Sequence, residues 1–190
     1  MTTITFPAPT STRINMMPII FGDSASIPTQ LHGYLPMLAA AHFTQGDTVY
    51  LTVDESYVPA GATQRRAGIH TDATNRVGWG GGHWGGNGGI YLASTDGLTS
   101  VWSEDVTADD VDDQGGLLHS LTSKPEHCQP NTLYRIGDQT PHASIASTQD
   151  TYRQFFRLVG HEIGVWYSRH STPNPFGVLP CAPIVTSSKF

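Results

Sequence analysis

The residue types best suited to chemistry in this sequence are two histidines and an aspartate. His70 and Asp72 form a His-x-Asp triplet, and His142 follows a Thr-Pro pair much later in the chain. Residues two apart in a strand point to the same face, so His70 and Asp72 can offer an imidazole nitrogen and a carboxylate oxygen to one metal ion. His142 can supply a third ligand from a distant strand, which leaves the opposite coordination positions open for substrates. We therefore predict a mononuclear metal site at these three residues.

Two arginines follow the last of these candidate ligands. Arg153 and Arg157 lie four residues apart in a predicted strand, so their side chains share one face. A guanidinium group can hold a carboxylate through two parallel hydrogen bonds. Two histidines and one carboxylate are also the ligand set that non-haem Fe(II) oxygenases use. Either arginine could therefore anchor an oxo-acid beside the metal.

A glycine-rich segment, GWGGGHWGGNGG at 78–89, predicts a loop that carries Trp79, His83 and Trp84. Glycine lets backbone approach a ligand closely, so His83 could contact a substrate or the metal, although a loop histidine without such a role is the simpler interpretation. Trp79 and Trp84 could form an aromatic wall over the pocket, or they could pack the loop against a sheet. These three residues are our candidates for substrate binding.

The elements that must position these residues are mostly short strands. Apolar runs separated by glycine, proline, threonine and serine favour strands over long helices. The predicted strands are Thr48–Val53, Gln64–His70, Ile90–Ser94, Leu98–Trp102, Thr132–Ile136, Ala143–Ala146, Arg153–Val159 and Gly164–Ser168. Strands at such short intervals suit a sandwich or barrel, and we expect Ile90–Ser94 and Leu98–Trp102 to pair as a hairpin. One helix, Tyr34–Phe43, should pack outside the sheet.

Composition narrows the class of protein. The chain has 190 residues and a formal net charge of −6, from ten basic and sixteen acidic residues. No cluster of Lys and Arg could track a phosphate backbone, so we expect no nucleic-acid partner. Without an apolar run that could cross a bilayer or a visible secretory signal, we predict one soluble, cytoplasmic domain over 1–190. Cys128 and Cys181 are expected to be free thiols.

Other charged segments are given structural roles. The acidic run Glu104–Gln114 predicts a solvated surface loop, and the proline-rich Ser171–Pro183 should wrap the surface. If Arg65 and Arg66 precede His70 in a strand, at most one of them points inward, and salt bridges are their expected role. Surface or capping roles are also expected for His119, His127, His161 and His170.

The order of His70-x-Asp72, then His142, then an arginine-bearing strand resembles the Fe(II)- and 2-oxoglutarate-dependent dioxygenase family. The core of that family is a jelly roll, also called a double-stranded β-helix, which carries an HxD motif, a distant histidine and a basic residue beyond it. The resemblance spans about 48–168 and depends on about five positions. It implies a mainly β fold with one or two short helices, in a single jelly-roll domain. It also implies that His70, Asp72 and His142 hold Fe(II).

The same resemblance implies roles for the arginines and a reaction. Arg153 or Arg157 would bind the distal carboxylate of 2-oxoglutarate, with a slight preference for Arg153. The oxo-acid would chelate the iron and be decarboxylated to succinate as oxygen is used to oxidise a substrate, while the protein positions and shields the reactants. We expect that substrate to be a small molecule or a peptide side chain.

Two alternatives from other classes remain open. A cupin-like metal oxygenase or isomerase would use the same ligands for iron, manganese or zinc without any oxo-acid, and would leave Arg153 and Arg157 structural. A jelly-roll binding module without a metal would use the tryptophan- and glycine-rich loop to contact a sugar or a protein partner. Dependence on an oxo-acid separates the first alternative from the oxygenase, and metal content separates the second.

Overall fold

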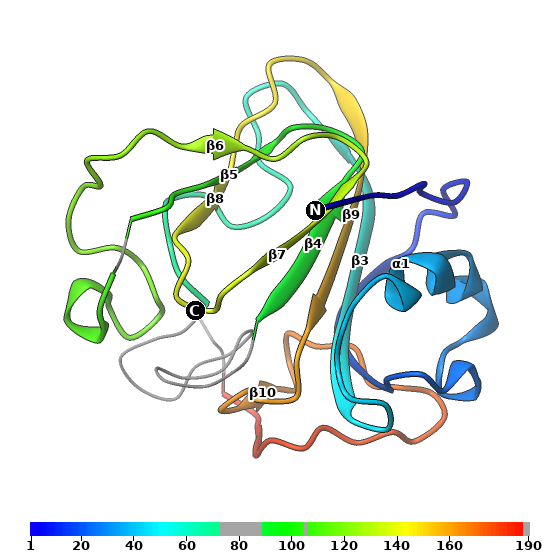
Figure 1. The fold of residues 1–190 in the computed structure, drawn as a ribbon. Coiled ribbons are helices and arrows are strands. Elements are labelled where there is room, and N and C mark those ends of the chain that lie inside the picture. The colour runs from blue at the N-terminus through cyan, green and yellow to red at the C-terminus, as the bar shows by residue number, and fades with distance from the viewer. Residues whose placement is uncertain (73–88, 105, 188–190) are drawn as a thin grey trace.

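The computed structural model describes residues 1–72, 89–104 and 106–187. Within these ranges the chain is mainly β-structure with one short α-helix, which confirms the predicted class (Figure 1). None of the helices in the described ranges is long and apolar enough to span a membrane. Trp79, His83 and Trp84 lie outside the described residues.

The largest element of the described chain is a six-stranded sheet with the order β1-β7-β4-β9-β3-β2. Its strands are β1 (Thr2–Thr3), β2 (Arg13–Ile20), β3 (Thr48–Val58), β4 (Ile90–Ser94), β7 (Thr132–Ile136) and β9 (Thr151–Val159). All neighbouring strands in it are antiparallel, and β3 and β9 pair along nearly their whole lengths. Strand β9 therefore lies in the interior of the sheet, between β4 and β3.

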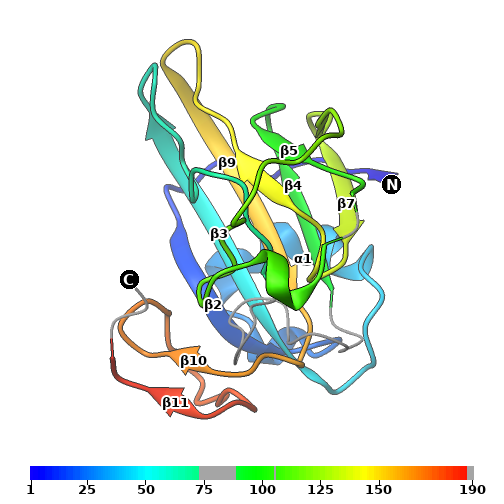
Figure 2. The ribbon, with the colours of Figure 1, turned by 90° about the vertical axis from the view of Figure 1, so that its left-hand side faces the viewer.

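Two smaller sheets complete the β-structure. The first has the order β6-β5-β8, and the second pairs β10 with β11 in parallel. Their strands are β5 (Thr99–Val101), β6 (Glu126–His127), β8 (His142–Ser144), β10 (Trp166–Tyr167) and β11 (Ile184–Val185). Figure 1 shows β5, β6 and β8 on one side of the large sheet and α1 (Leu35–Ala39) on the other. Figure 2 shows β10 and β11 together at one end of the molecule.

Strict alternation along β3 and β9 separates the two sides of the large sheet. Val49 and Leu51 of β3 and Phe156 of β9 join the core under α1, whereas Tyr50 and Phe155 join the core on the opposite side. This is the period of two expected for strands with both faces buried. Arg153 and Arg157 therefore share the face of Phe155, as their spacing predicted.

The predicted helix is shorter than expected. The α-helix α1 ends at Ala39 and is preceded by a 3-10 helix, Thr29–Tyr34, which follows another at Ser24–Ser26. The chain turns inward after α1, because Phe43 packs edge-on against both Phe21 and Tyr91. A continued helix would remove Phe43 from these contacts.

The prediction of a strand over Gln64–His70 was wrong. Only His70 forms a β-bridge, and Gly68 has a φ of +78°, in the left-handed region that favours glycine and breaks a strand. The side chain of Gln64 also donates to the carbonyl oxygens of Asp54 and Arg153 at 3.0 Å each. Bonds of this side chain thus tie the segment to β3 and β9 in place of a backbone ladder.

The predicted hairpin of Ile90–Ser94 with Leu98–Trp102 was also wrong. Strand β4 is paired on both edges, with β7 and β9, so it has no free edge for β5. Asp96 turns the chain instead, and its carboxylate accepts a hydrogen bond from the backbone N–H of Leu98 at 3.1 Å. Strand β5 consequently crosses to the smaller sheet and pairs with β6 and β8.

The predictions for the proline-rich segment, the acidic run and the two cysteines agree with the structure. Residues from 171 to 183 lie along β2, where the buried Asn174 side chain donates to the carbonyls of Pro18 and Ser26 at 2.8 Å. The acidic run contains a short 3-10 helix, Ala108–Asp110, with no buried residue. Cys128 is buried, Cys181 is exposed, and both are free.

A buried carboxylate anchors the N-terminal segment to the sheet. Glu55 is 2% exposed, and it accepts hydrogen bonds from the Tyr34 hydroxyl at 2.6 Å and from the backbone N–H groups of Thr10 and Thr12 at 2.6 and 2.8 Å. Burial alone would raise the pKa of Glu55, but these hydrogen bonds outweigh it and the pKa is lowered. The folded state therefore favours the ionised carboxylate.

We expect Tyr34→Phe to lower the free energy of unfolding by about 2 kcal/mol at pH 7, because a buried, charge-assisted hydrogen bond is lost. A carboxyl with a lowered folded pKa stabilises the fold above its unfolded pKa and loses this effect as pH falls through the folded value. The cost of the substitution should therefore shrink as Glu55 is protonated. Urea unfolding across a pH series tests this. Tyr152→Phe, at a largely exposed position, is the control and should change stability by less than about 0.5 kcal/mol. A pH-independent cost would contradict the assignment.

Candidate metal centre

The two candidate histidine ligands are joined through their backbones. The His70 N–H donates to the carbonyl of His142 at 3.0 Å, and the His142 N–H donates to that of His70 at 2.9 Å. This reciprocal pair places the side chains directly opposite each other across an antiparallel bridge. Two residues far apart in sequence are thereby held in one register.

The neighbouring backbone of the His-x-Asp triplet is fixed in the same way. The Thr71 N–H donates to the carbonyl of Gly115 at 2.8 Å, and the Asp72 N–H donates to that of Asp138 at 3.0 Å. The triplet is therefore extended between β8 on one side and the chain near Gly115 on the other. In this conformation His70 and Asp72 point to the same face, which the sequence spacing predicted.

The imidazole rings are oriented by equivalent hydrogen bonds. Nδ1 of His70 lies 2.9 Å from the carbonyl oxygen of Gly68, and Nδ1 of His142 lies 2.9 Å from that of Thr140. A carbonyl oxygen only accepts, so each Nδ1 carries the proton and each Nε2 keeps its lone pair. Metal-ligating histidines are usually held by a hydrogen bond of this kind.

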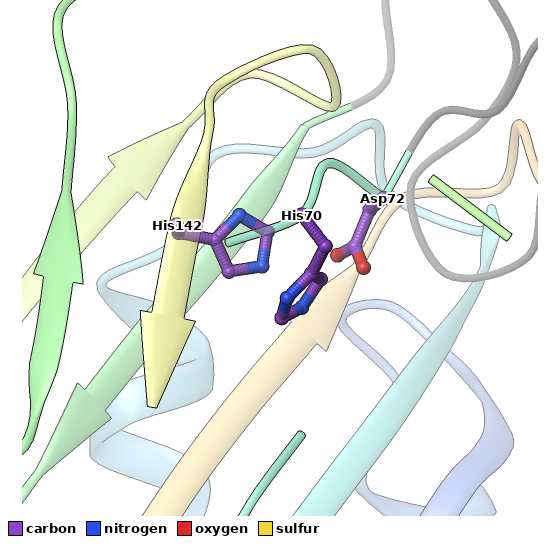
Figure 3. Close-up of side chains that lie close together, drawn as sticks. All are labelled: His70, Asp72 and His142. Carbon is purple, nitrogen blue, oxygen red and sulfur yellow. The ribbon is translucent and has the colours of Figure 1, made fainter. Parts of the chain in front are cut away.

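The three side chains converge on one point (Figure 3). One nitrogen from each of His70 and His142 and one Asp72 oxygen lie within 4.8 Å of one another. The histidines are 7% and 9% exposed, and burial together with the charge of the neighbouring His142 lowers the pKa of His70 to about 3. Burial also lowers the pKa of His142. Both rings are therefore neutral at pH 7, as metal binding requires, and this group can hold a metal ion.

Arg157 is the partner of the third candidate ligand. Its guanidinium forms a salt bridge with Oδ2 of Asp72, and both side chains are 11% exposed. A carboxylate has two oxygens, so one can ligate a metal while the other accepts from an arginine. Arg157 can therefore orient Asp72 through one carboxylate oxygen and leave the other oxygen for a metal ion.

The three candidate ligands, His70, Asp72 and His142, form a trio that opens onto a cavity. The volume of this cavity is about 560 Å³, which is within the usual size of small-molecule sites. Its walls include the apolar Leu92 and Phe155 and the polar Asn15 and Thr99. Three arginines also line it, namely Arg65, Arg66 and Arg157. A metal bound by the trio would therefore face a cavity with positively charged walls.

Arg153 has a different position from Arg157. It is fully buried and does not line the cavity, but Thr99 and Phe155, which it contacts, do. Its Nε donates to Asp96 at 2.8 Å, and one Nη donates to the hydroxyls of Ser94 and Thr99 at 3.2 and 3.0 Å. The other nitrogen, Nη1, is buried without a hydrogen-bond partner among the described residues. A buried charged group with an unused donor lies directly behind the cavity wall.

Sequence reasoning missed several residues of this cavity. Arg65 and Arg66 both line it, so the expectation that at most one points inward was wrong, because the segment is irregular and bent and is not a strand. His170 also lines the cavity, although it was assigned a surface role. Adjacent arginines four residues before the HxD motif are the one signal that could have indicated a charged wall. Phe155 and Thr99 carry no such signal.

Comparison with known proteins identifies no relative. No protein-family model matches this sequence, and neither a curated protein nor a solved structure was found to match it. The geometry of the site is therefore the basis for a function of this chain.

We expect His70→Ala and His142→Ala each to weaken binding of one divalent ion by more than about 100-fold, because each removes a ligand. Arg157→Gln should weaken it by about 10- to 100-fold, since it releases Asp72 from its orienting partner. Titration of the chelator-treated protein with Co(II), followed by visible absorption and calorimetry, measures both effects. His119→Ala, at an exposed position, is the control and should bind normally. Equal affinity in His142→Ala and the native chain would exclude this centre.

Proposed function

We propose that this chain is an Fe(II)- and 2-oxoglutarate-dependent oxygenase of a small molecule or a peptide side chain. The observation that carries the proposal is the combination of a His-Asp-His trio, which opens onto a cavity, with a buried arginine that has an unused donor next to that cavity. Two histidines and a carboxylate suit Fe(II) and leave positions for an oxo-acid and oxygen. The arginine supplies a counter-charge for the far end of the oxo-acid.

The environment of Arg153 favours it over Arg157 as the carboxylate anchor. A buried N–H without a partner is costly, and a carboxylate that enters beside Thr99 would remove this cost for Nη1. Both arginines are ion-paired, Arg157 with Asp72 and Arg153 with Asp96, so the buried Nη1 of Arg153, which has no hydrogen-bond partner among the described residues, is what separates them. In this proposal Arg153 binds the oxo-acid, and Arg157 orients the metal ligand Asp72.

The order of the strands supports a jelly roll for this fold. Starting at β3 and counting the His70 segment as the second strand, the first, third, sixth and eighth strands lie in the large sheet. The second, fourth, fifth and seventh lie in the smaller one. Eight strands shared between two facing sheets in this way are typical of a jelly roll. The metal trio then sits where the second and seventh strands meet.

In this proposal the residues of the chain bind, orient and shield the reactants. Fe(II), 2-oxoglutarate and molecular oxygen together would supply the oxidising chemistry when bound. His70 and His142 present Nε2 lone pairs, while their Nδ1–H groups donate to the backbone carbonyls of Gly68 and Thr140. Leu92 and Phe155 form apolar walls that exclude water from the reacting positions.

We expect anaerobic addition of Fe(II) and 2-oxoglutarate to the native protein to produce the visible charge-transfer absorption of a chelated oxo-acid. His142→Ala should abolish the band, because chelation requires the metal. Replacement of 2-oxoglutarate by succinate, which has no oxo group, is the control and should give no band. A native protein that binds Fe(II) but gives no band would favour a cupin-like metal enzyme without an oxo-acid.

We also expect Arg153→Gln to weaken 2-oxoglutarate binding by about 2 to 4 kcal/mol, the cost of removing one member of a buried charged pair. Because Arg153 also supports the fold, Thr99→Val provides a milder test and should cost about 1 kcal/mol. Calorimetry on the Zn(II)-loaded protein measures both, and metal affinity should remain unchanged. If only Arg157→Gln impairs the oxo-acid, the assignment of the two arginines must be reversed.

A further inference from the structure

Two arginines of the cavity have no part in the roles described above. Arg65 and Arg66 line the cavity next to the metal trio, on the turn that follows β3. Arg65 is held over the face of Phe155, with its guanidinium carbon 5.4 Å from the ring centroid. A cation at this distance is attracted to the ring, so the stacking orients Arg65 along the cavity wall.

Both guanidinium groups keep unused hydrogen-bond capacity. Arg65 donates to Asn15 Oδ1 at 3.1 Å and to Asp54 Oδ2 at 3.4 Å, and Arg66 donates to the carbonyl of Gln114 at 2.7 Å. A guanidinium carries five N–H donors in a planar fork, so each side chain retains donors for a bidentate contact. The acceptor that Arg66 uses is neutral and does not compensate its charge.

The described residues that line the cavity include more arginines than carboxylates. Asp72 is the only carboxylate among the described residues that line it. A divalent ion, Asp72, a doubly charged oxo-acid and Arg157 would neutralise one another, and Arg153 is paired with Asp96. Arg65 shares its partner Asp54 with Arg13, which lies 3.3 Å from that carboxylate. Arg66 is attracted by Asp112, but neither Asp112 nor Asp54 lines the cavity, so the wall itself presents the positive groups of Arg65 and Arg66.

The pKa shifts of these groups have the same cause. Burial, followed by repulsion from Arg157, lowers the pKa of Arg65 despite the attraction of Asp54. Burial lowers the pKa of Arg66 as well, and the attraction of Asp112 and Asp72 offsets it only in part. An anion between the two arginines would stabilise both charges.

We propose that Arg65 and Arg66 bind an anionic group of the substrate, so that the substrate is a small molecule with a carboxylate or a similar anion. The inference rests on the proposed oxygenase function for the identity of the reaction, but the anion site itself depends only on the cavity. The apolar walls at Leu92 and Phe155 suit a hydrocarbon body attached to this anion. The anionic end would hold that body beside the metal.

The test uses benzoate and benzamide, which have the same shape and differ in charge. Calorimetry is performed on the protein loaded with Zn(II) and saturating 2-oxoglutarate, so that the metal and the oxo-acid site are filled. We expect benzoate to bind at least about 10-fold more tightly than benzamide, because a charge-assisted hydrogen bond is worth more than a neutral one. Arg65→Gln and Arg66→Gln should each remove about 10-fold of the benzoate affinity.

Arg13→Gln is the matched control, because Arg13 also pairs with Asp54 but is 70% exposed and does not line the cavity. It should change benzoate affinity by less than about 2-fold. Urea midpoints of all three variants verify that they fold. Equal binding of benzoate and benzamide, or an unchanged benzoate affinity in both cavity variants, would overturn the inference.

The same titrations separate this inference from the oxygenase proposal. If 2-oxoglutarate binds and benzoate does not, the anion site is wrong and the oxygenase proposal stands. If 2-oxoglutarate fails to bind while benzoate binds through Arg65 and Arg66, the anion site is supported and the oxygenase proposal fails.

Discussion

The structure depends on one reciprocal pair of backbone hydrogen bonds, between His70 and His142. The segment that carries His70 is otherwise irregular, so no ladder of several residues fixes its register. The bridge brings the two imidazoles next to each other, with ring centroids 4.5 Å apart and ring planes at 56°. Because side chains alternate along an extended chain, the same bridge also decides that Asp72 joins them. The geometry of the candidate metal centre thus follows from a backbone pairing between residues far apart in the chain.

Alternation along β9 has a comparable effect on the charges of the site. Arg153, Phe155 and Arg157 face the smaller sheet, while Phe156 and Leu158 face the core under α1. One strand therefore places two guanidinium groups and an aromatic ring on the face that lies near the metal trio. A shift of one residue in the pairing of β9 with β3 would bury these arginines among the apolar side chains of the opposite core.

The arginines of this region are chemically distinct despite their proximity. Arg153 is enclosed and paired with Asp96, Arg157 is paired with Asp72, and Arg65 and Arg66 remain at the open cavity. The ionic partner, and not the residue type, separates the roles that we propose for anchoring an oxo-acid, orienting a ligand and attracting an anion. In a low-dielectric cavity such differences of pairing carry large energetic consequences.

The sequence by itself was sufficient for the mainly β class, for most strands of the large sheet, and for the three candidate ligands. Local pattern determines the strands and the pairing of His70 with Asp72, since apolar runs, turn residues and an i, i+2 spacing act over a few positions, whereas His142 was predicted from the order of the motifs along the chain. Only the tertiary structure decided that β4 and β5 separate into different sheets and that Gln64–His70 is an irregular segment with a single bridge residue. It also decided that Arg65 and Arg66 both reach the cavity. These outcomes depend on which strand edges are already paired and on contacts between residues far apart in the chain, and neither is encoded in local periodicity.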